Sequence, residues 1–374
     1  MKVLYVHDFC FYKNDETIFT AVGLPEKYFD RFLLNGAKEV RVFSRNKIAE
    51  KNDIESAGFF SIKNKHIKLP IPVKNYFELL SPKVFYALNR LLRETDVIVI
   101  NFPSIIGLYL CFLCKLYNRK YVLEVAADDD QFLNKKGGLF LTFIFRMVFC
   151  KFVRRAEGAI YVSDNLLKKY PNKNSEVASN VYIDKLNFRG GRRKKEEFDI
   201  LFAGGVNKRK GVDILLGALH YLIKVEGVRV TLHIAGGHLD DDYECIVDEY
   251  GIRENVVFHG ILERRVLEDL YYKCDLYVQP SRAEGIPRAT IEAMSFGLPV
   301  VATQLPGFKE ILSEDCLVPI GDSIKLANKI KIILNDDSIY KLYSDINLGS
   351  AEKFLISNLD KRRNSFFSQF LRLG

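Results

Sequence analysis

Short apolar segments typical of buried β-strands alternate with helical segments twice along the chain. In the first half, this strand pattern occurs at 3–7, 39–44, 97–101 and 121–126, and residues 105–117 are helical. The pattern begins again at 198–205 and recurs at 229–237, 255–262, 275–280 and 298–303. Alternating strands and helices form parallel sheets that helices cover. The sequence therefore predicts an α/β protein with two doubly wound, Rossmann-like domains in tandem.

A polar, strongly basic segment at 189–198 separates the two series. We expect a first domain over 1–188 and a second over 189–354. The chain of 374 residues is long enough for each domain to bury its own core.

Charge is distributed unevenly between these two parts. Residues 1–190 contain 30 Lys or Arg and 20 Asp or Glu, whereas residues 191–374 contain 25 and 27. No nucleic-acid-binding motif accompanies the basic excess. It favours an anionic membrane surface or a phosphate-bearing acceptor as the partner, and no nucleic acid. The Phe-rich segment 139–155 fits either a core helix or a helix in a membrane interface.

Cysteine usage and the N-terminus predict a cytoplasmic protein. The seven cysteines follow no disulfide framework, and Cys111 and Cys114 fall in an apolar helical run, which favours burial over metal or redox chemistry. No signal peptide precedes the first expected strand.

The segment 275–310 is the most informative about function. Its pattern indicates strand, loop, helix and strand, with Pro287 suited to the first helical turn and Gly297 to the helix end. Seven residues separate Glu284, in the loop, from Glu292, in the helix. Carboxylates in this layout accept hydrogen bonds from sugar or ribose hydroxyls, while helix N-terminal amides face an anion. The alternative is that Glu292 forms a surface pair with Arg288, four residues earlier.

The stretch EGIPRATIEAMSFGLPVVATQLPGFKEIL, residues 284–312, resembles the donor-site signature of the family 4 retaining glycosyltransferases. This resemblance implies the GT-B fold, in which two Rossmann-like domains face a cleft, and a C-terminal helix, here about 355–374, that packs back on the first domain. It also implies that Glu284 lies beside the donor sugar and that Glu292 binds the ribose hydroxyls.

A second segment, 202–216, combines a strand, a glycine-containing turn and a helix that begins near Gly211. Lys208, Arg209 and Lys210 project where the helix N-terminus would meet a diphosphate. The family resemblance implies that Lys210 contacts the donor diphosphate. Relatives carry an arginine where this chain has Gly205, so we expect Arg209 or Lys208 to supply the second cation.

The resemblance also implies the remaining donor contacts. The catalytic candidates are Glu284, Lys210 and Arg209. The donor-binding candidates are Gly204, Gly205, Lys210, His259, Gly260, Ile261, Glu284, Gly285, Ile286, Pro287 and Glu292. Of these, 259–261 would lie at the nucleobase, although a strand that ends in a turn explains those residues equally well. The diphosphate is a good leaving group, so fixed cations and amides suffice and no metal or cofactor is expected.

Acceptor recognition is expected in the first domain. His7 and Asp8 end the first strand, at the edge where open α/β sheets bind ligands. Asn101 stands where many relatives have a histidine near the reaction centre, and it is neither acid nor base. An orienting or structural role for His7 and Asp8 remains open. The acidic run 128–130 suggests a solvated loop at the acceptor mouth more than a metal site.

Segments 7–9, 23–25, 124–130 and 159–171 resemble, in order, the glycosyltransferases of surface polysaccharide assembly, and 178–184 resembles that family's hinge. The sequence thus predicts transfer of a sugar, from UDP as the favoured nucleotide, to a glycan acceptor, with retention of configuration. The pathway would be O-antigen, capsule or exopolysaccharide synthesis, with a lipid-linked acceptor at the inner face of the membrane. The alternatives are a non-catalytic scaffold with this fold, which Gly205 and Asn101 favour, and a sugar-nucleotide epimerase.

Overall fold

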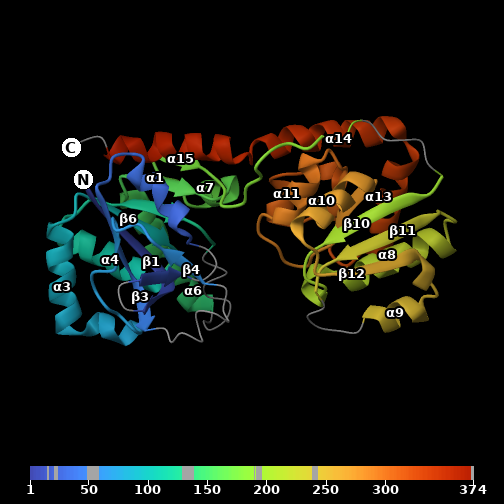
Figure 1. The fold of residues 1–374 in the computed structure, drawn as a ribbon. Coiled ribbons are helices and arrows are strands. Elements are labelled where there is room, and N and C mark those ends of the chain that lie inside the picture. The colour runs from blue at the N-terminus through green and yellow to red at the C-terminus, as the bar shows by residue number, and fades with distance from the viewer. Residues whose placement is uncertain are drawn as a thin grey trace. The chain divides into compact units, whose positions relative to one another are not determined.

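The structure is a computed structural model that describes residues 1–14, 17–20, 24–48, 59–128, 139–188, 190, 196–237 and 243–371. The chain forms two compact units, Met1–Ser179 with Asp360–Gly374, and Asn180–Leu359 (Figure 1). Each unit has its own sheet covered by helices. Much of the linker 189–198, and also Gly23, Asp129 and Asp130, lie outside the described residues.

The second unit begins earlier than residue 189. Ile183 is buried, and its backbone N–H donates to the Phe354 carbonyl at 2.9 Å. The Asn187 N–H donates to the Ser295 carbonyl at 2.8 Å. Residues 180–188 therefore pack on the second unit, because their apolar side chains complete its core. The division falls at the start of the segment that resembles the family hinge.

The first unit contains a sheet of nine strands in the order β4-β2-β1-β6-β7-β8-β9, with β3 beside β1 and β5 beside β3. The strands are β1 (Lys2–Asn14), β2 (Thr17–Thr20), β3 (Glu39–Ile48), β4 (Phe60–Ile62), β5 (Ile67–Lys68), β6 (Val97–Phe102), β7 (Val122–Val125), β8 (Gly158–Tyr161) and β9 (Ser175–Val177). Among these described strands, only the pairs of β2 with β1 and with β4 are antiparallel.

The sequence predicted that the first strand ends at His7 and Asp8, and this prediction is wrong. The strand continues to Asn14, with an irregularity in its pairing to β3 between Val6 and Cys10. Only Val3–Val6 pair with β6, so His7 and Asp8 still lie where the central parallel sheet ends. The alternation in FCFYKN allows the strand to continue as a hairpin with β2.

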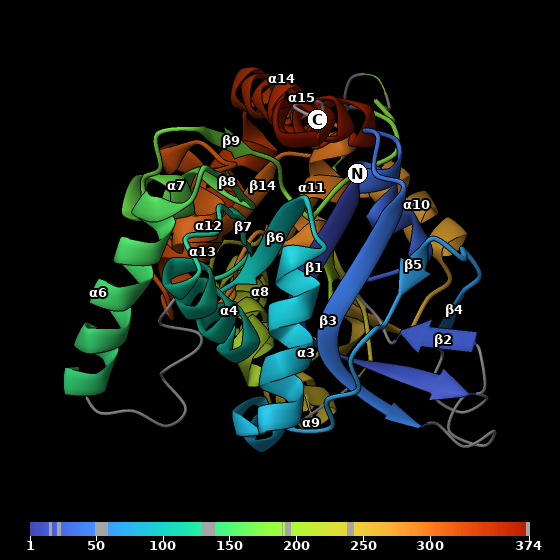
Figure 2. The same ribbon diagram turned by 90° about the vertical axis from the view of Figure 1, so that its left-hand side faces the viewer.

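Helices cover both faces of this sheet (Figures 1 and 2). One core cluster joins the sheet to four helices: α3 (Pro82–Arg93), α4 (Ile105–Leu116), α6 (Leu139–Arg155) and α7 (Asp164–Lys169). Three further helices, η1 (Glu26–Phe29), α1 (Asp30–Leu33) and α15 (Ile356–Leu371), contribute aromatic contacts outside this cluster. η2 (Tyr76–Leu80) precedes α3. Cys111 and Cys114 are buried in α4, as expected. Within the described residues, no helix is both long enough and apolar enough to cross a membrane.

The terminal helix α15 belongs mainly to the first unit. From Asp360 onward it is part of that unit, where Phe366 and Phe367 are buried and Phe367 packs edge-on against Phe32. The Arg363 guanidinium donates to the Ser179 carbonyl. These contacts explain why the C-terminal residues join a domain that otherwise ends at residue 179.

The second unit has six parallel strands in the order β12-β11-β10-β13-β14-β15. They are β10 (Phe198–Ala203), β11 (Val230–Ala235), β12 (Val256–Gly260), β13 (Leu276–Gln279), β14 (Val300–Thr303) and β15 (Leu317–Val318). The helices are η3 (Lys208–Lys210), α8 (Val212–Lys224), α9 (Tyr243–Glu249), η4 (Arg253–Asn255), α10 (Arg264–Lys273), α11 (Arg288–Ser295), α12 (Pro306–Lys309), η5 (Glu314–Cys316), α13 (Ser323–Asn335) and α14 (Asp337–Glu352).

This strand order places a switch point in the centre of the sheet. From β10 the chain proceeds outward through β11 and β12, and then returns to the other side of β10 as β13. The loops after β10 and β13 therefore leave the same edge in opposite directions. Open α/β sheets bind ligands in the crevice that this divergence creates.

Candidate active site

The two loops at the switch point bring Lys210 and Glu284 together. Lys210 Nζ lies 2.7 Å from Glu284 Oε1, and the two side chains are 15% and 11% exposed. Such a pair of a cation and a carboxylate, both largely removed from water, forms a strong charge-assisted hydrogen bond. The structure thus places the predicted diphosphate-binding lysine and the predicted sugar-binding carboxylate in direct contact.

The loop that carries Lys210 is fixed by its own sequence. Asn207 caps η3, with its side-chain oxygen accepting from the Lys210 N–H at 3.0 Å. Gly211 follows with a φ of 74°, and a Cβ there would lie 2.0 Å from the Pro280 carbonyl oxygen. Glycine is therefore required at 211 both for the backbone angle and for the close approach of the second loop.

An arginine and an aspartate join the two loops. Arg282, two residues before Glu284, contacts both carboxylate oxygens of Asp213 at 2.7 and 2.6 Å and donates to the Lys208 carbonyl. The Arg282 N–H also donates to the Arg209 carbonyl at 2.8 Å. A bidentate guanidinium–carboxylate pair fixes orientation as well as distance. The sequence does not predict this pair, because nothing local indicates that residues 213 and 282 meet.

Arg209 lies beside the same carboxylate but is more exposed. Its Nη1 is 3.3 Å from Glu284 Oε2 and 3.2 Å from the Ala283 carbonyl oxygen, and its side chain is 58% exposed. The structure therefore brings all three catalytic candidates, Lys210, Arg209 and Glu284, into one cluster. Lys208 is exposed, and its carbonyl accepts from Arg282.

Glycine turns join the loops after β10, β11 and β12. The Gly204 N–H donates to the Ala235 carbonyl at 2.9 Å, and the Gly236 N–H donates to the Gly260 carbonyl at 2.8 Å. A Cβ at Gly236 would lie 1.8 Å from the Gly204 oxygen. Gly204 lies beside the Lys210 side chain, whose Cε would be 3.8 Å from a Cβ at residue 204. Gly205 follows in the same turn, so the turn beside Lys210 presents backbone without side chains.

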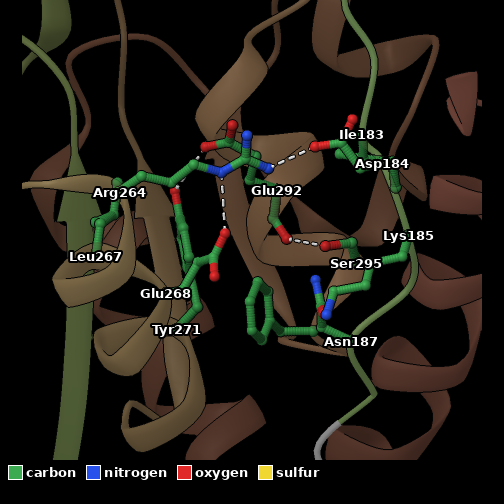
Figure 3. Close-up of a pocket in the computed structure, with 11 residues that line it drawn as sticks. Ile183, Asp184, Lys185, Asn187, Arg264, Leu267, Glu268, Tyr271, Glu292 and Ser295 are labelled. Atoms are coloured by element: carbon green, nitrogen blue, oxygen red, sulfur yellow. Dashed lines mark hydrogen bonds and ion pairs between the residues drawn. The ribbon is translucent and has the colours of Figure 1, made fainter.

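Glu292 lies on α11, in a pocket of about 70 Å³ within the second unit (Figure 3). The pocket is lined by Ile183, Asp184, Lys185, Asn187, Arg264, Leu267, Glu268, Tyr271, Glu292, Ser295 and Phe296. Burial raises the pKa of the Glu292 carboxyl, and the positive charges of Arg288 and Arg264 oppose this rise. Arg264 bridges Asp184 at 2.8 Å and Glu268 at 3.0 Å beside Glu292.

The alternative of a simple surface pair does not describe Glu292. It is partly buried, and Tyr271 Oη lies 3.5 Å from its Oε2. The Arg288 guanidinium instead lies over the Tyr182 ring, 5.3 Å from its centre. Glu284 and Glu292 both influence Tyr277, because their negative charges add to the burial that raises the pKa of that phenol.

The backbone around α11 differs slightly from the expected pattern. The helix begins at Arg288, so Pro287 is its N-cap residue and not its first helical residue. Gly297, with a φ of 72°, ends the helix as expected. A Cβ at Gly307 would lie 1.8 Å from the Gly285 oxygen, so α12 abuts the turn that carries Gly285 and Ile286. Gly285 itself is exposed.

The candidate nucleobase residues lie at the end of β12. His259 Nε2 is 3.0 Å from His233 Nδ1, and the two rings stack. Burial and this neighbour lower the pKa of His259. Gly260 has a φ of 65°, and the Ile261 side chain is 87% exposed. These contacts lead to β11 and not to the Lys210–Glu284 pair, so the role of 259–261 depends on the family resemblance.

In the first unit, the acceptor candidates have mainly structural partners. Asp8 accepts from the N–H groups of Ile105 at 2.8 Å and Ile106 at 3.0 Å, and so caps the N-terminus of α4. Asn101 is buried, and its carbonyl accepts from Ser104. His7 Nδ1 accepts from the Phe9 N–H at 2.8 Å, which leaves Nε2 to carry the proton of a neutral ring. Burial lowers the pKa of His7 to about 4.

A buried polar cluster next to His7 was not predicted. Glu124, on β7, accepts from Tyr5 at 2.9 Å and Tyr28 at 2.5 Å, and it pairs with Arg31 at 3.0 Å. Burial raises the pKa of both phenols. Glu124 stands inside the apolar pattern of β7, which is the one signal that could have suggested a partner.

The acidic segment that follows β7 is represented in the structure by Asp128. Its Oδ1 accepts from Lys169 Nζ at 2.6 Å and from Tyr170 Oη at 2.7 Å. Among the described residues, no group of three or more His, Cys, Asp or Glu side chains is placed to hold a metal ion.

Comparison with known proteins indicates which kind of protein has a segment like the one that carries this site. Residues 184–347, which include Lys210, Glu284 and Glu292, match the family model described as "Glycosyl transferases group 1". This segment is similar to the group 1 glycosyltransferases. The match supports the prediction of a glycosyltransferase at this level.

Two curated proteins resemble this segment together with most of the remaining chain. Protein CapJ from Staphylococcus aureus is 26% identical over 94% of this chain and 90% of its own length. An N-acetylgalactosaminyltransferase from Campylobacter jejuni, whose name gives an acceptor glycan on PP-undecaprenol, is 24% identical over 82% of this chain and 87% of its own.

Solved structures confirm the fold. HepE from Anabaena, crystallised with UDP, superimposes with a TM-score of 0.67 at 18% identity, over 99% of this chain and 100% of its own. The predicted GT-B fold, with two Rossmann-like halves of which the second contains the segment that matches the group 1 model, is therefore correct.

Proposed function

We propose that this protein is a family 4 retaining glycosyltransferase that moves a sugar from a nucleoside diphosphate, with UDP favoured, to a glycan acceptor. The observation that carries the proposal is the contact of Lys210 with Glu284 at the switch point of the second sheet. A cation there meets the diphosphate, and a carboxylate there meets the hydroxyls of the donor sugar.

Each donor-site residue has a separate task in this proposal. Lys210 and Arg209 stabilise the charge that builds on the β-phosphate as the bond to the sugar breaks. Glu284 orients the sugar, and the amides of Gly285 and Ile286 face it. Glu292, which lies in its own pocket with Tyr271, takes the ribose hydroxyls. Fixed cations make the reaction independent of an added metal ion.

The proposed transfer retains the anomeric configuration. The bond from the anomeric carbon to the diphosphate oxygen breaks, and the acceptor oxygen bonds to the same face of the sugar. The acceptor hydroxyl passes its proton to the departing diphosphate, so no enzymatic nucleophile is required. His7, Asp8 and Asn101 would lie on the acceptor side, with His7 as a neutral donor and Asp8 holding α4 in place.

The proposed acceptor is a lipid-linked oligosaccharide in surface polysaccharide synthesis, at the inner face of the cytoplasmic membrane. The likeness to CapJ over nearly the full length of both chains supports the polysaccharide assignment. The acceptor in the name of the Campylobacter enzyme supports a polyprenyl-linked glycan. The basic excess of residues 1–190 supports peripheral association with an anionic membrane.

Calorimetric titration with UDP, GDP and CDP, without added metal, tests the proposal. We expect one nucleotide, UDP, to bind the parent protein well and Glu292→Ala at least about tenfold more weakly, because one charge-assisted contact contributes about 1.5–3 kcal/mol. Glu314→Ala, which changes a glutamate in η5 away from the pocket, is the matched control and should bind like the parent.

Two results would redirect the assignment. Binding of no nucleotide would favour the non-catalytic scaffold, for which Gly205 and Asn101 are the supporting features. Nucleotide binding followed by interconversion of the free sugar nucleotide, without any acceptor, would favour an epimerase. Full transfer activity in both Lys210→Ala and Glu292→Ala would refute the assignment of the donor site.

A further inference from the structure

Large apolar side chains are exposed at one edge of the first unit. Phe77 and Leu80 of η2 are 85% and 80% exposed, Ile105 begins α4, and Phe143 and Met147 of α6 are 59% and 53% exposed. We call these five residues the apolar rim. Exposed apolar side chains gathered in this way mark an interaction surface.

The topology places η2 and the starts of α4 and α6 at the same end of the sheet. η2 and α3 precede β6, α4 precedes β7 and α6 precedes β8, and these strands are parallel. A helix that leads into a parallel strand starts at the carboxyl edge of the sheet. η2 and the starts of these helices therefore lie toward the carboxyl edge, on the face that the core cluster of α3, α4 and α6 covers (Figure 2).

The charge of these helices indicates what the rim meets. α3, α4 and α6 contain no Asp or Glu, and three of their eight Lys or Arg residues, Lys83, Arg146 and Lys151, precede the last helical turns, which lie toward the opposite edge of the sheet. Lys83 and Lys151 are exposed on α3 and α6, and Lys74 is exposed just before η2. A partner protein with mixed charges does not require this composition, whereas an anionic bilayer attracts each cation and accepts the apolar side chains.

The sequence of α6 changes along its outward side. Phe143, Ile144, Met147 and Val148 are exposed over 143–148, with the exposed Arg146 among them, and Lys151 with the following arginines is exposed farther along the helix. The opposite side of the helix is anchored, because Phe149 and Val153 are buried in the core cluster of the sheet.

We propose that the apolar rim docks on an anionic lipid bilayer, with Phe143 and Met147 of α6 in the headgroup region and Lys83 and Lys151 on the lipid phosphates. The inference rests on the proposed lipid-linked acceptor, because it gives that acceptor a membrane at the edge where open α/β sheets bind ligands. The inference names the residues that would contact the membrane, whereas the charge excess of residues 1–190 does not identify a surface.

Flotation of the full-length chain with vesicles tests this proposal and needs no nucleotide. The parent should bind vesicles rich in phosphatidylglycerol and bind pure phosphatidylcholine vesicles far more weakly. A rim variant, Phe77→Ser with Phe143→Ser and Met147→Ser, should bind the anionic vesicles at least about tenfold more weakly, since each apolar side chain loses its burial. Lys83→Gln with Lys151→Gln should weaken binding by about fivefold per charge.

A control variant in the second unit separates the rim from general surface hydrophobicity. Ile324→Ser with Ile332→Ser and Leu342→Ser removes apolar side chains of similar exposure from α13 and α14 and should bind vesicles like the parent. UDP titration and thermal unfolding of each variant check the fold. Loss of UDP binding by every protein would refute the donor site but not the vesicle result.

Three outcomes would overturn the proposal. In the first, the parent does not bind anionic vesicles, and in the second, the rim variant binds them as well as the parent does. In the third, sedimentation shows a dimer that only the rim substitutions dissociate, which would mean that a second copy of the chain covers the rim.

Discussion

Lys210 and Glu284 are 74 positions apart in the chain, yet their side chains meet at 2.7 Å across the switch point of the second sheet. The pair consists of a cation and its counter-charge, and each side chain is the other's partner in the structure. If Lys210 binds the donor diphosphate as we propose, the diphosphate has to compete with Glu284 for the Lys210 ammonium.

Replacing Lys210 tests the first half of this pair. Lys210→Ala should abolish measurable sugar transfer and weaken UDP binding by roughly 10- to 100-fold, because a contact to a charged group contributes about 1.5–3 kcal/mol. Lys208→Ala removes an exposed lysine from the same turn and should change UDP affinity by less than about twofold. Equal losses in the two variants would show that only the overall positive charge of the turn matters. Calorimetry and a transfer assay give both numbers.

Replacing Glu284 should separate binding from catalysis. In Glu284→Gln the amide keeps the shape but no longer neutralises Lys210, so UDP should bind several-fold more tightly. Transfer should nevertheless fall, because the donor sugar loses its charged acceptor. Weaker binding of UDP in this variant would indicate that Glu284 organises Lys210 and does not compete for it.

Gly211 should be intolerant of a side chain. With a φ of 74° and the Pro280 oxygen only 2.0 Å from where a Cβ would stand, Gly211→Ala should lower the free energy of unfolding of the second unit by at least about 2 kcal/mol. Gly349→Ala is the opposite control, because this helical glycine has open space and alanine should stabilise α14 by up to about 1 kcal/mol. Denaturant titration measures both changes.

Nucleotide affinity should depend on pH through Glu292. Burial raises the pKa of this carboxyl, so it takes up a proton at a higher pH than an ordinary glutamate. As the pH falls through that raised pKa, the ribose hydroxyls lose an ionised acceptor and UDP should bind more weakly. In Glu292→Gln this part of the pH dependence should be absent. Identical pH profiles for the two proteins would place the ribose elsewhere.

His7 should affect stability at mildly acidic pH. Its pKa is lowered from 6.5 to about 4 in the fold, so between these values the unfolded chain binds a proton that the folded chain does not. The stabilisation is complete above pH 6.5 and is lost as the pH falls toward 4, by about 2 kcal/mol for this partly buried ring. His7→Gln should lose this difference, which parallel unfolding titrations of the two proteins at several pH values would detect.

The sequence by itself determined which segments form strands and helices in the two halves, because hydrophobic periodicity reports burial directly. β6, α4 and β10 begin and end within two residues of their predicted bounds. The same patterns, with the resemblance of residues 284–312 to a donor signature, predicted a glycosyltransferase and placed Lys210 and Glu284 in one candidate site, and the structure brings these two side chains into contact. The position of Gly297 in the sequence also predicted the end of a helix, since a helix end often needs a residue with a positive φ.

Tertiary structure decided the rest. Three features join residues from different loops or strands. They are the ion pair of Arg282 with Asp213, the partial burial of Glu292 beside Tyr271 and Arg264, and the polar cluster around Glu124. Segment 180–188 and helix α15 also joined their units through packing that their own sequences do not specify. Hydrophobic periodicity predicts that a side chain is buried, but only the folded structure shows which residues it packs against. Side-chain pairing across a sheet edge depends on strand order, which no local pattern encodes.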